Sequence, residues 1–272
     1  MSPDDAAFAR LLGSVSGAVG MTLDAYKDKC IRRRVAVRMR ACGAQSYDEY
    51  RDVLERTPGE LDRLRDALTI NVTRFYRNPE AWNALASKFL PELWERNAGH
   101  LLAWSAGCAS GDEPYTMAML IAEQCRVARQ PGWLDRATIH ATDVDRASME
   151  QARNAVYRED AFQDLPPALR ERYTEATPAG RAVVPAVRDR VLVSELDLSG
   201  GQPAGVRYQL IVCRNVVIYF DRPLQERLFA MFVEHLSDDG LLVLGKVETL
   251  LGRARDQMDL VDVRERIYRR RA

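Results

Sequence analysis

Small and acidic residues follow an apolar run near the middle of the chain, and their order suits ligand binding. The run Leu101–Trp104 precedes Gly107 and Gly111, which are followed at once by Asp112 and Glu113. Glycine has no Cβ and accepts positive φ, so backbone between the two glycines can turn sharply against a ligand. A dinucleotide fingerprint has three glycines and places a pyrophosphate at the helix start, which two carboxylates would repel. The pattern predicts a site for a nucleotide-like ligand with a cationic or amine-bearing group, such as S-adenosylmethionine. The alternative is a tight strand-to-helix connection.

Other polar residues follow apolar runs in the same way. Asp143 ends the second such run, where an acid in an open α/β sheet takes ribose hydroxyls. Taken alone, an aspartate at this point is more often a helix N-cap, but its order after the Gly107 loop favours the ligand role. Arg214 and Asn215 follow a later apolar run, which we interpret as another buried strand. Of the aromatic pair that comes next, we assign Phe220 to packing and keep Tyr219 as a site candidate.

These residues require strands that end at one edge of a sheet. From about residue 98, strand-like runs alternate with helical patterns, which is typical of an α/β protein with a parallel sheet. Residues before about 70 have helical patterns only. At about residues 157–190 the alternation of strands and helices is interrupted for longer than a loop normally spans, which indicates an inserted segment. We expect a helical domain over 1–75, a linker helix over 76–97, and an α/β domain over 98–272 with a small subdomain inserted at about 157–190 and a closing antiparallel hairpin.

A basic helix near the N-terminus is the candidate for contact with a protein partner. From Lys29 to Tyr47 the chain has six cations and no acid, whereas a merely soluble helix usually mixes both signs. Arg34 and Arg38 are one turn apart beside an apolar stripe, and Arg40 follows. We expect these three arginines to guide a carboxylate-rich helix, mainly by raising the association rate and fixing register. The alternative is a solvated face of an amphipathic helix.

Composition restricts the class of protein. The 272 residues include 39 Lys and Arg and 39 Asp and Glu, so no overall charge favours nucleic acid or a membrane. The five cysteines have no CxxC spacing, and the three histidines are scattered, which argues against a disulfide framework and a metal site. No apolar run approaches the ~18 residues of a membrane span. We therefore expect a cytoplasmic protein without metal, nucleic-acid partner or membrane insertion.

Four motifs in chain order resemble the chemotaxis receptor glutamate methyltransferases, the CheR family. They are Asn71-Val72-Thr73-Arg74-Phe75-Tyr76-Arg77, Trp104 to Tyr115, Ala141 to Asp145, and Cys213 to Asp221. The resemblance covers nearly the whole chain. It implies an S-adenosylmethionine-dependent, Rossmann-like methyltransferase domain with a mostly parallel sheet, a preceding all-α domain, and a small β-subdomain. It also implies methyl transfer to glutamate carboxylates on the cytoplasmic helical domain of a methyl-accepting chemotaxis receptor or similar signalling protein, with S-adenosylhomocysteine as product.

The resemblance also implies roles for single residues. Thr73 and Arg77 match linker residues that reach the cofactor, Glu113 and Asp143 match those that hold its amino-acid and ribose parts, and Asp197-Leu198 match the segment beside the adenine. Arg214, Asn215 and Tyr219 match the residues nearest the transferred methyl group. The predicted cofactor-binding residues are therefore Thr73, Arg77, Gly107, Glu113, Asp143, Asp197, Leu198, Arg214 and Asn215, and the predicted catalytic residues are Arg214 and Tyr219.

Several positions depart from the family pattern. Gln209 stands where the family commonly has Asp, Val37 interrupts the basic helix where relatives can carry Arg, and Asp197 stands where Asn is frequent. Lys246-Val247 replaces a usual His-Ser pair. Lys246 matters most, because it adds a charge near the mouth of the last parallel strand.

The implied chemistry needs few groups. A glutamate side chain with a reference pKa of about 4.3 is ionised near neutral pH, so it attacks a methyl carbon without a general base. The enzyme supplies placement and desolvation, and placement can account for about 7 to 11 kcal/mol of a barrier. Our hypothesis is that Arg214 orients the acceptor carboxylate or organises its pocket, and that Tyr219 lines the transfer path. Two alternatives are a non-catalytic S-adenosylmethionine-binding regulator and a nucleic-acid methyltransferase that uses the basic helix.

Overall fold

The computed structural model describes the chain except for residues 1, 20–22, 24–25, 69–72, 204 and 272. The chain forms two compact units. The first comprises residues 1–70 with 199–201 and 219–225, and the second comprises 71–198, 202–218 and 226–272. None of the helices in the described part of the chain combines the length and the apolar character that a membrane crossing requires.

The first unit is built from helices, as its sequence pattern predicts. They are α1 (Pro3–Val19), α2 (Asp28–Cys42), α3 (Tyr47–Arg56) and α4 (Glu60–Leu68). Helix α3 begins where the Ser46 hydroxyl accepts a hydrogen bond from the Glu49 N–H, which satisfies one of the free N–H groups of its first turn. Helix α2 ends at Gly43 in the left-handed conformation. Buried Leu11, Ile31 and Leu64 belong to the core that α1, α2 and α4 form around α3.

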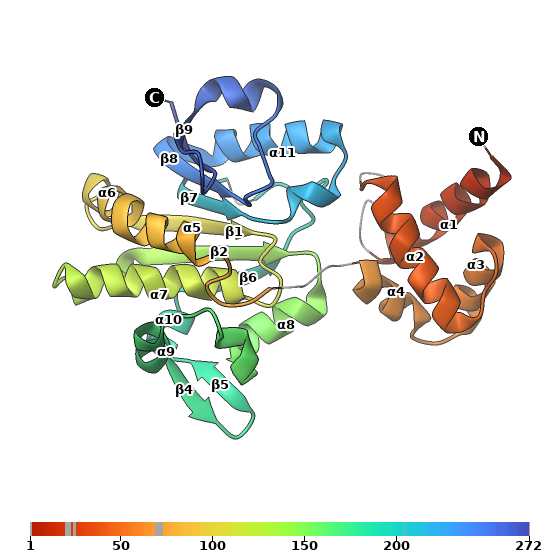
Figure 1. Ribbon diagram of the computed structural model, residues 1–272, viewed down its shortest axis with the longest axis horizontal. Helices are drawn as coiled ribbons and strands as arrows, with labels where there is room; N and C mark the ends of the chain where they lie inside the picture. The colour runs from red at the N-terminus through yellow and green to blue at the C-terminus, as the bar shows by residue number, and fades with distance from the viewer. Residues whose placement is uncertain (1, 20–22, 24–25, 69–72, 204, 272) are drawn as a thin grey trace. The chain divides into compact units, whose positions relative to one another are not determined.

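The second unit contains a seven-stranded sheet with the order β6-β2-β1-β7-β8-β10-β9 (Figure 1). The strands are β1 (Leu101–Ala106), β2 (Ala137–Asp143), β6 (Val191–Glu195), β7 (Tyr208–Cys213), β8 (Leu236–Leu244), β9 (Met258–Asp262) and β10 (Ile267–Arg270). The first five strands in that order pair in parallel, and β10 and β9 pair antiparallel to their neighbours. The predicted α/β class, the mostly parallel sheet and the closing hairpin are confirmed.

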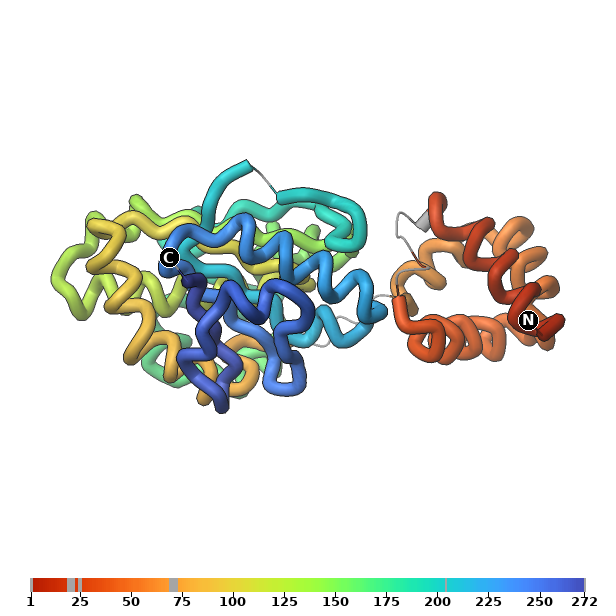
Figure 2. The backbone as a smooth tube through the Cα atoms, turned by 90° about the horizontal axis from the view of Figure 1, so that it is seen from above, coloured from red at the N-terminus to blue at the C-terminus, as the bar shows by residue number. Residues whose placement is uncertain are grey.

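Helices and helical turns connect these strands. They are α5 (Pro79–Ala84), α6 (Leu90–Arg96), α7 (Asp112–Val127), α8 (Arg146–Asn154) and α11 (Arg222–His235), with 3-10 turns at Pro131–Arg136, Val217–Tyr219 and Gly252–Gln257. The linker helix predicted over 76–97 is interrupted by a π-helical turn at Leu85–Phe89. Pro91 follows that turn and has no N–H to donate, which favours a local widening of the helix. Figures 1 and 2 show the segment from α5 to α6 beside α7.

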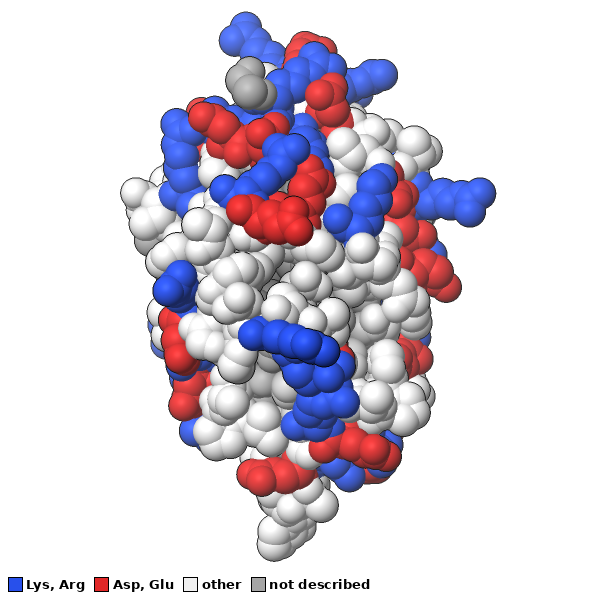
Figure 3. All heavy atoms as spheres, turned by 90° about the vertical axis from the view of Figure 1, so that its left-hand side faces the viewer, with Lys and Arg blue, Asp and Glu red and all other residues white. Residues whose placement is uncertain are grey.

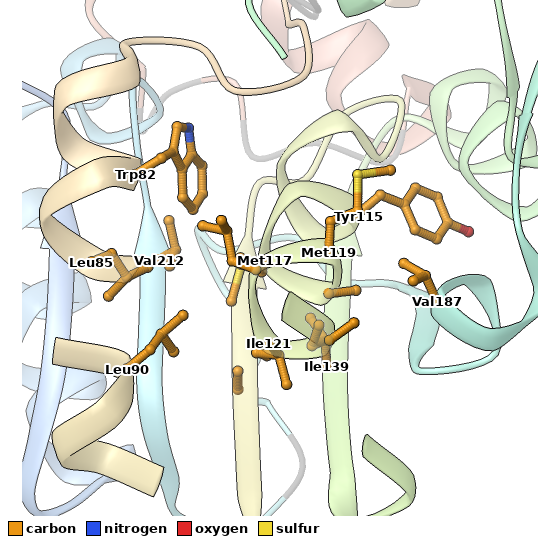
Figure 4. Close-up of a cluster of buried hydrophobic side chains, with 14 of the residues drawn as sticks. Trp82, Leu85, Leu90, Tyr115, Met117, Met119, Ile121, Ile139, Val187 and Val212 are labelled. Carbon is orange, nitrogen blue, oxygen red and sulfur yellow. The ribbon is translucent and has the colours of Figure 1, made fainter. Parts of the chain in front are cut away.

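The core of the second unit lies between this segment, α7 and the sheet. Figure 4 shows Trp82 and Leu85 pointing toward Met117 of α7, with Val212 of β7 and Ile139 of β2 facing the same cluster. All five side chains are buried. Strands with buried residues on consecutive positions, as in β1 and β7, are typical of a parallel sheet that is covered on both faces.

A small antiparallel sheet is inserted between β2 and β6, as the family resemblance implied. It has the order β3-β5-β4, with β3 (Val156–Tyr157), β4 (Thr174–Thr177) and β5 (Gly180–Val183). Helices α9 (Pro167–Tyr173) and α10 (Pro185–Arg188) and a 3-10 turn at Glu159–Phe162 complete the insertion. The root of the insertion, residues 157–162, packs on the linker segment, residues 73–78. The Phe75 ring lies 4.4 Å from the Phe162 ring and 4.9 Å from the Tyr157 ring.

Charged side chains of both signs are interspersed on the surface. Arg96 pairs with Asp239 at 2.7 Å, and Arg126 pairs with Glu123 at 2.6 Å. On the face shown in Figure 3, Lys and Arg side chains lie next to Asp and Glu side chains. A nucleic-acid-binding face would carry a basic patch or stripe, and the mixture of signs on this face differs from that pattern.

Candidate functional site

The loop after β1 has a shape that only glycine permits at two positions. Gly107 and Gly111 have φ values of 82° and 93°. A Cβ on Gly107 would lie 2.5 Å from Val216 Cγ2, and one on Gly111 would lie 2.8 Å from both the Ala152 Cβ and the Tyr157 hydroxyl. Both residues are therefore fixed by conformation and by close packing. The loop delivers the chain into α7 at the carboxyl end of β1, where open α/β sheets bind ligands.

Glu113 is a largely buried acid in the first turn of α7, beside the buried Asp112. Its side chain is 13% exposed, its Oε1 accepts a 2.9 Å hydrogen bond from the Ser105 hydroxyl, and its Oε2 lies 3.9 Å from Arg214 Nη1. Burial raises the pKa of Glu113 to about 7, although Arg214 acts in the opposite direction. A carboxyl group in this position gains most from a ligand that brings a positive charge.

Asp143 connects β2 to the same loop. Its Oδ2 accepts a hydrogen bond from the Ala109 N–H at 2.8 Å, and its Oδ1 accepts from Val144 and Asp145. Burial raises its pKa, while these backbone donors act to lower it. The N-cap of α8 is Asp145, which accepts from the Ala147 N–H, so the alternative reading of Asp143 as the cap is wrong. Asp143 holds the loop and keeps acceptor capacity for a ligand hydroxyl.

Arg214 joins β7 to the linker. Its Nη2 donates to the Arg77 carbonyl and to Asn78 Oδ1, both at 2.9 Å, and its guanidinium lies 5.1 Å from the Trp82 ring. The side chain is 3% exposed, and its Nε has no hydrogen-bond partner among the described residues. Burial lowers the pKa of Arg214. These contacts tie the end of β7 to residues 77–82 beside Glu113.

Asn215 follows in a left-handed conformation, with φ of 61°. Its N–H donates to Glu248 Oε2 at 2.9 Å, and the Val216 N–H donates to Glu248 Oε1 at 3.0 Å. Sequence reasoning gave Glu248 no role. The local signal for its role as a hydrogen-bond acceptor is that it lies just beyond the end of a parallel strand. Its two partners are 32 and 33 residues away, so the sequence does not identify them.

The remaining predicted cofactor residues lie around the same sheet edge. Thr73 and Arg77 line a cavity of about 430 Å³ together with Ser110 and Asp112 of the loop. Burial raises the pKa of Asp112 to about 6.

Asp197 and Leu198 follow β6, and the Leu196 N–H beside them donates to the Asp143 carbonyl. Asn71 and Val72 of the linker motif lie outside the described residues.

Two family models together match most of this chain. The CheR methyltransferase all-alpha domain matches residues 6–69, and the CheR methyltransferase SAM binding domain matches residues 71–267. The chain belongs to the CheR methyltransferase family. It is 31% identical to a chemotaxis protein methyltransferase of Borreliella burgdorferi, over 90% of this chain and 88% of the relative. It is 30% identical to the chemotaxis protein methyltransferase of Escherichia coli, over 90% and 84% of the two chains.

The CheR family assignment makes this protein an S-adenosylmethionine-dependent methyltransferase of chemotaxis. The geometry fits that cofactor, because a buried carboxyl with a raised pKa suits its cationic part and the glycines permit close backbone approach. Within the described ranges, no group of three or more His, Cys, Asp or Glu side chains has the arrangement of a metal site.

Two departures from the CheR pattern have defined partners. Lys246 Nζ lies 3.1 Å from Glu80 Oε2 and 3.8 Å from Glu265 Oε2, so the charge that the sequence adds near β8 belongs to an ion-pair cluster. Gln209 Oε1 accepts a 2.7 Å hydrogen bond from the Leu102 N–H. Gln209 therefore helps to join β7 to β1.

Helix α2 uses two of its three predicted partner-binding arginines internally. Arg38 donates to both carboxylate oxygens of Glu60, at 3.0 and 2.7 Å, and Glu60 is 2% exposed. Arg34 is buried, with its guanidinium 5.1 Å from the ring of half-buried Tyr219. Arg34 and Arg38 thus already contact side chains within the first unit, and their contact with a receptor helix stays a prediction. Arg40 is exposed.

Proposed function

We propose that this CheR family enzyme methylates glutamate side chains on the cytoplasmic helical domain of a methyl-accepting chemotaxis receptor or a similar signalling protein. The product would be a glutamyl methyl ester, and the enzyme would act in the cytoplasm. The observation that carries the donor half of this proposal is the largely buried Glu113 carboxyl in the first turn of α7, with Ser105 and Arg214 near its two oxygens. The acceptor half is supported by family membership and by relatives that are chemotaxis protein methyltransferases.

In this proposal the donor lies along the carboxyl ends of four strands. Bound S-adenosylmethionine supplies an electrophilic methyl group on a sulfonium. Glu113 would hold the amino group of its methionine part, Thr73 and Arg77 would approach from the linker, and Asp143 would accept from the ribose. Asp197-Leu198, which follow β6, would flank the adenine, and Gly107 would allow the backbone to approach.

The acceptor needs no base, because a glutamate carboxylate is already ionised at neutral pH. The work of the chain is then to hold the acceptor in line and to exclude water. The bonds from Arg214 to Arg77 and Asn78 favour the second of its two hypothesised roles, in which it organises the pocket. Tyr219 is proposed to line the transfer path, and Asn215 to contact the donor.

The first unit supports the proposal that residues 1–75 form a substrate-recognition domain. Arg40 keeps its proposed role as a partner contact, since it is exposed. Arg33 and Val37 are also exposed on α2, at spacings that place them on the same helix face. We propose that this face meets an acidic receptor helix and that Arg34 and Arg38 support it from within the unit.

The test is transfer of label from tritiated S-adenosylmethionine to receptor cytoplasmic domains, followed by mild alkali. Carboxyl methyl esters release methanol under alkali and N-methyl groups do not, so we expect volatile label. Alkali-stable label would contradict ester formation. Binding of S-adenosylmethionine without any labelling would favour the non-catalytic regulator.

Two variants test the assigned roles. We expect Arg214→Ala and Tyr219→Phe to lower turnover of the receptor domain. If both variants retain the turnover of the wild type, the roles of Arg214 and Tyr219 in methyl transfer are wrong.

A further inference from the structure

A buried carboxylate beyond the end of β8 holds the turn that carries Arg214 and Asn215. Glu248 is 3% exposed. Its Oε2 accepts from the Gly245 N–H at 2.6 Å and from the Asn215 N–H at 2.9 Å, and its Oε1 accepts from the Val216 N–H at 3.0 Å. The backbone of Ile218 also hydrogen-bonds to it. One side chain thus gathers backbone donors from two loops.

These bonds fix a conformation that the turn would otherwise disfavour. A non-glycine residue with φ of 61°, as at Asn215, persists only where its surroundings determine it. The two loops also approach too closely for any side chain at Gly245, because a Cβ there would lie 2.6 Å from Glu248 Oε2 and 3.0 Å from the Asn215 nitrogen. The carboxylate is therefore clamped between the loops.

The turn that Glu248 holds contacts two other parts of the proposed site, the loop after β1 and the linker segment. Gly107 packs against Val216, so the turn supports the loop after β1, which we call the donor loop. Arg214 reaches the linker through its bonds to Arg77 and Asn78. A displacement of this turn would therefore move the loop contact and the linker contact together.

We propose that Glu248 is a positioning residue for methyl transfer, which acts by holding the 214–218 turn through backbone hydrogen bonds. The inference rests on the proposed function. A carboxylate is suited to this role because both of its oxygens only accept hydrogen bonds. In Glu248→Gln one oxygen becomes an NH2 group that faces backbone donors, which leaves buried N–H groups unpaired. In Glu248→Asp the charge is kept and the side chain is one methylene shorter.

The experiment compares Glu248→Gln and Glu248→Asp with the wild type and with Val187→Ala. Val187 is a fully buried side chain of α10 in the same unit and takes no part in the hydrogen bonds of the turn, so its truncation reports general destabilisation. All four proteins are assayed at a temperature where tryptophan fluorescence shows them folded. The measured quantities are kcat and KM for the receptor domain and the Kd for S-adenosylhomocysteine.

We expect Glu248→Gln to lower kcat about 100-fold, the loss that a misplacement of about 1 Å can cause. KM for the receptor should change far less, because the proposed receptor contacts lie on α2. Glu248→Asp should recover part of kcat, and Val187→Ala should keep wild-type kcat despite a lower melting temperature. A kcat for Glu248→Gln equal to that of Val187→Ala would overturn the inference.

Failure of the proposed function has a different signature. If the wild type labels no receptor domain, the ester proposal fails, and the Kd for S-adenosylhomocysteine then decides the role of Glu248. We expect that Kd to be weaker in Glu248→Gln than in Val187→Ala. Equal affinities in the two variants would refute the positioning role.

Discussion

Replacement of Glu113 by glutamine should stabilise the protein at alkaline pH and weaken its hold on the cofactor. Burial raises the pKa of Glu113 from 4.5 to about 7. Because its pKa is higher in the folded state, its contribution to stability is fully present below pH 4.5 and is lost as the pH rises through 7. At 1.36 kcal/mol per pKa unit, this raised pKa lowers the stability of the folded state by about 3 kcal/mol at pH 8 and by about 1 kcal/mol at pH 5, relative to a side chain that carries no charge at either pH. Glutamine resembles the neutral acid and avoids that cost.

The assay is denaturant unfolding of ligand-free wild type and Glu113→Gln at pH 5 and pH 8, followed by tryptophan fluorescence. We expect the variant to be more stable by up to about 3 kcal/mol at pH 8, with a smaller difference at pH 5. Glu123→Gln on the same helix is the matched control. The Arg126 guanidinium lowers the pKa of Glu123, so this variant should be less stable than wild type at pH 8, and the deficit should shrink as the pH falls.

The affinity for S-adenosylhomocysteine should rise with pH, whereas the contribution of Glu113 to stability falls. The ionised form of Glu113 is the one that attracts the ligand ammonium, so wild-type affinity for S-adenosylhomocysteine should be about tenfold weaker at pH 6 than at pH 8 for a pKa near 7. The groups facing Glu113 are Ser105, Arg214, Arg77 and Glu248. Glu113→Gln should bind weakly at both values, with a flatter pH profile. A variant that is no more stable than wild type at pH 8, or that binds with the wild-type pH profile, would refute the reasoning.

Three further outcomes follow from the packing and the charges. Gly107→Ala should abolish detectable S-adenosylhomocysteine binding in calorimetry, because its Cβ would meet Val216 at 2.5 Å. Arg38→Ala should destabilise the first unit by about 1 to 3 kcal/mol in thermal unfolding, because it leaves Glu60 buried with fewer partners. Arg40→Ala should change stability by less than about 0.5 kcal/mol yet raise KM for the receptor domain, and that KM should rise with salt in wild type more than in the variant. A salt-independent KM would argue against a charged receptor contact.

Much of the fold could be predicted from local pattern. The run that ends at Asp143 is β2, and the chain before about residue 70 is helical as expected, because strand burial and helical periodicity leave marks within a few residues. The inserted sheet was reached through resemblance. Its strands are as short as Val156–Tyr157, too short to show a period.

The internal partners of the charged residues could not be predicted. Arg38 meets Glu60, 22 residues away, and Asn215 meets Glu248, 33 residues away. Periodicity identifies the face on which a side chain lies, and it carries no information about which distant acid reaches that face. The cap at Asp145 was missed for a related reason. Asp143 and Asp145 are both suitable caps, and the bond from Ala109 to Asp143 decides between them only in three dimensions.

The root of the inserted sheet sets limits on recombination between relatives. The Tyr157 hydroxyl donates to the Ser110 carbonyl of the donor loop at 2.7 Å, and the Phe75 N–H donates to the Ala161 carbonyl. The root is thus hydrogen-bonded to the proposed donor site, whereas the hairpin of β4 and β5 takes no part in these bonds. A chimera that exchanges only that hairpin should retain the donor site. A crossover between Tyr157 and Ala161 would separate residues that have to be inherited together.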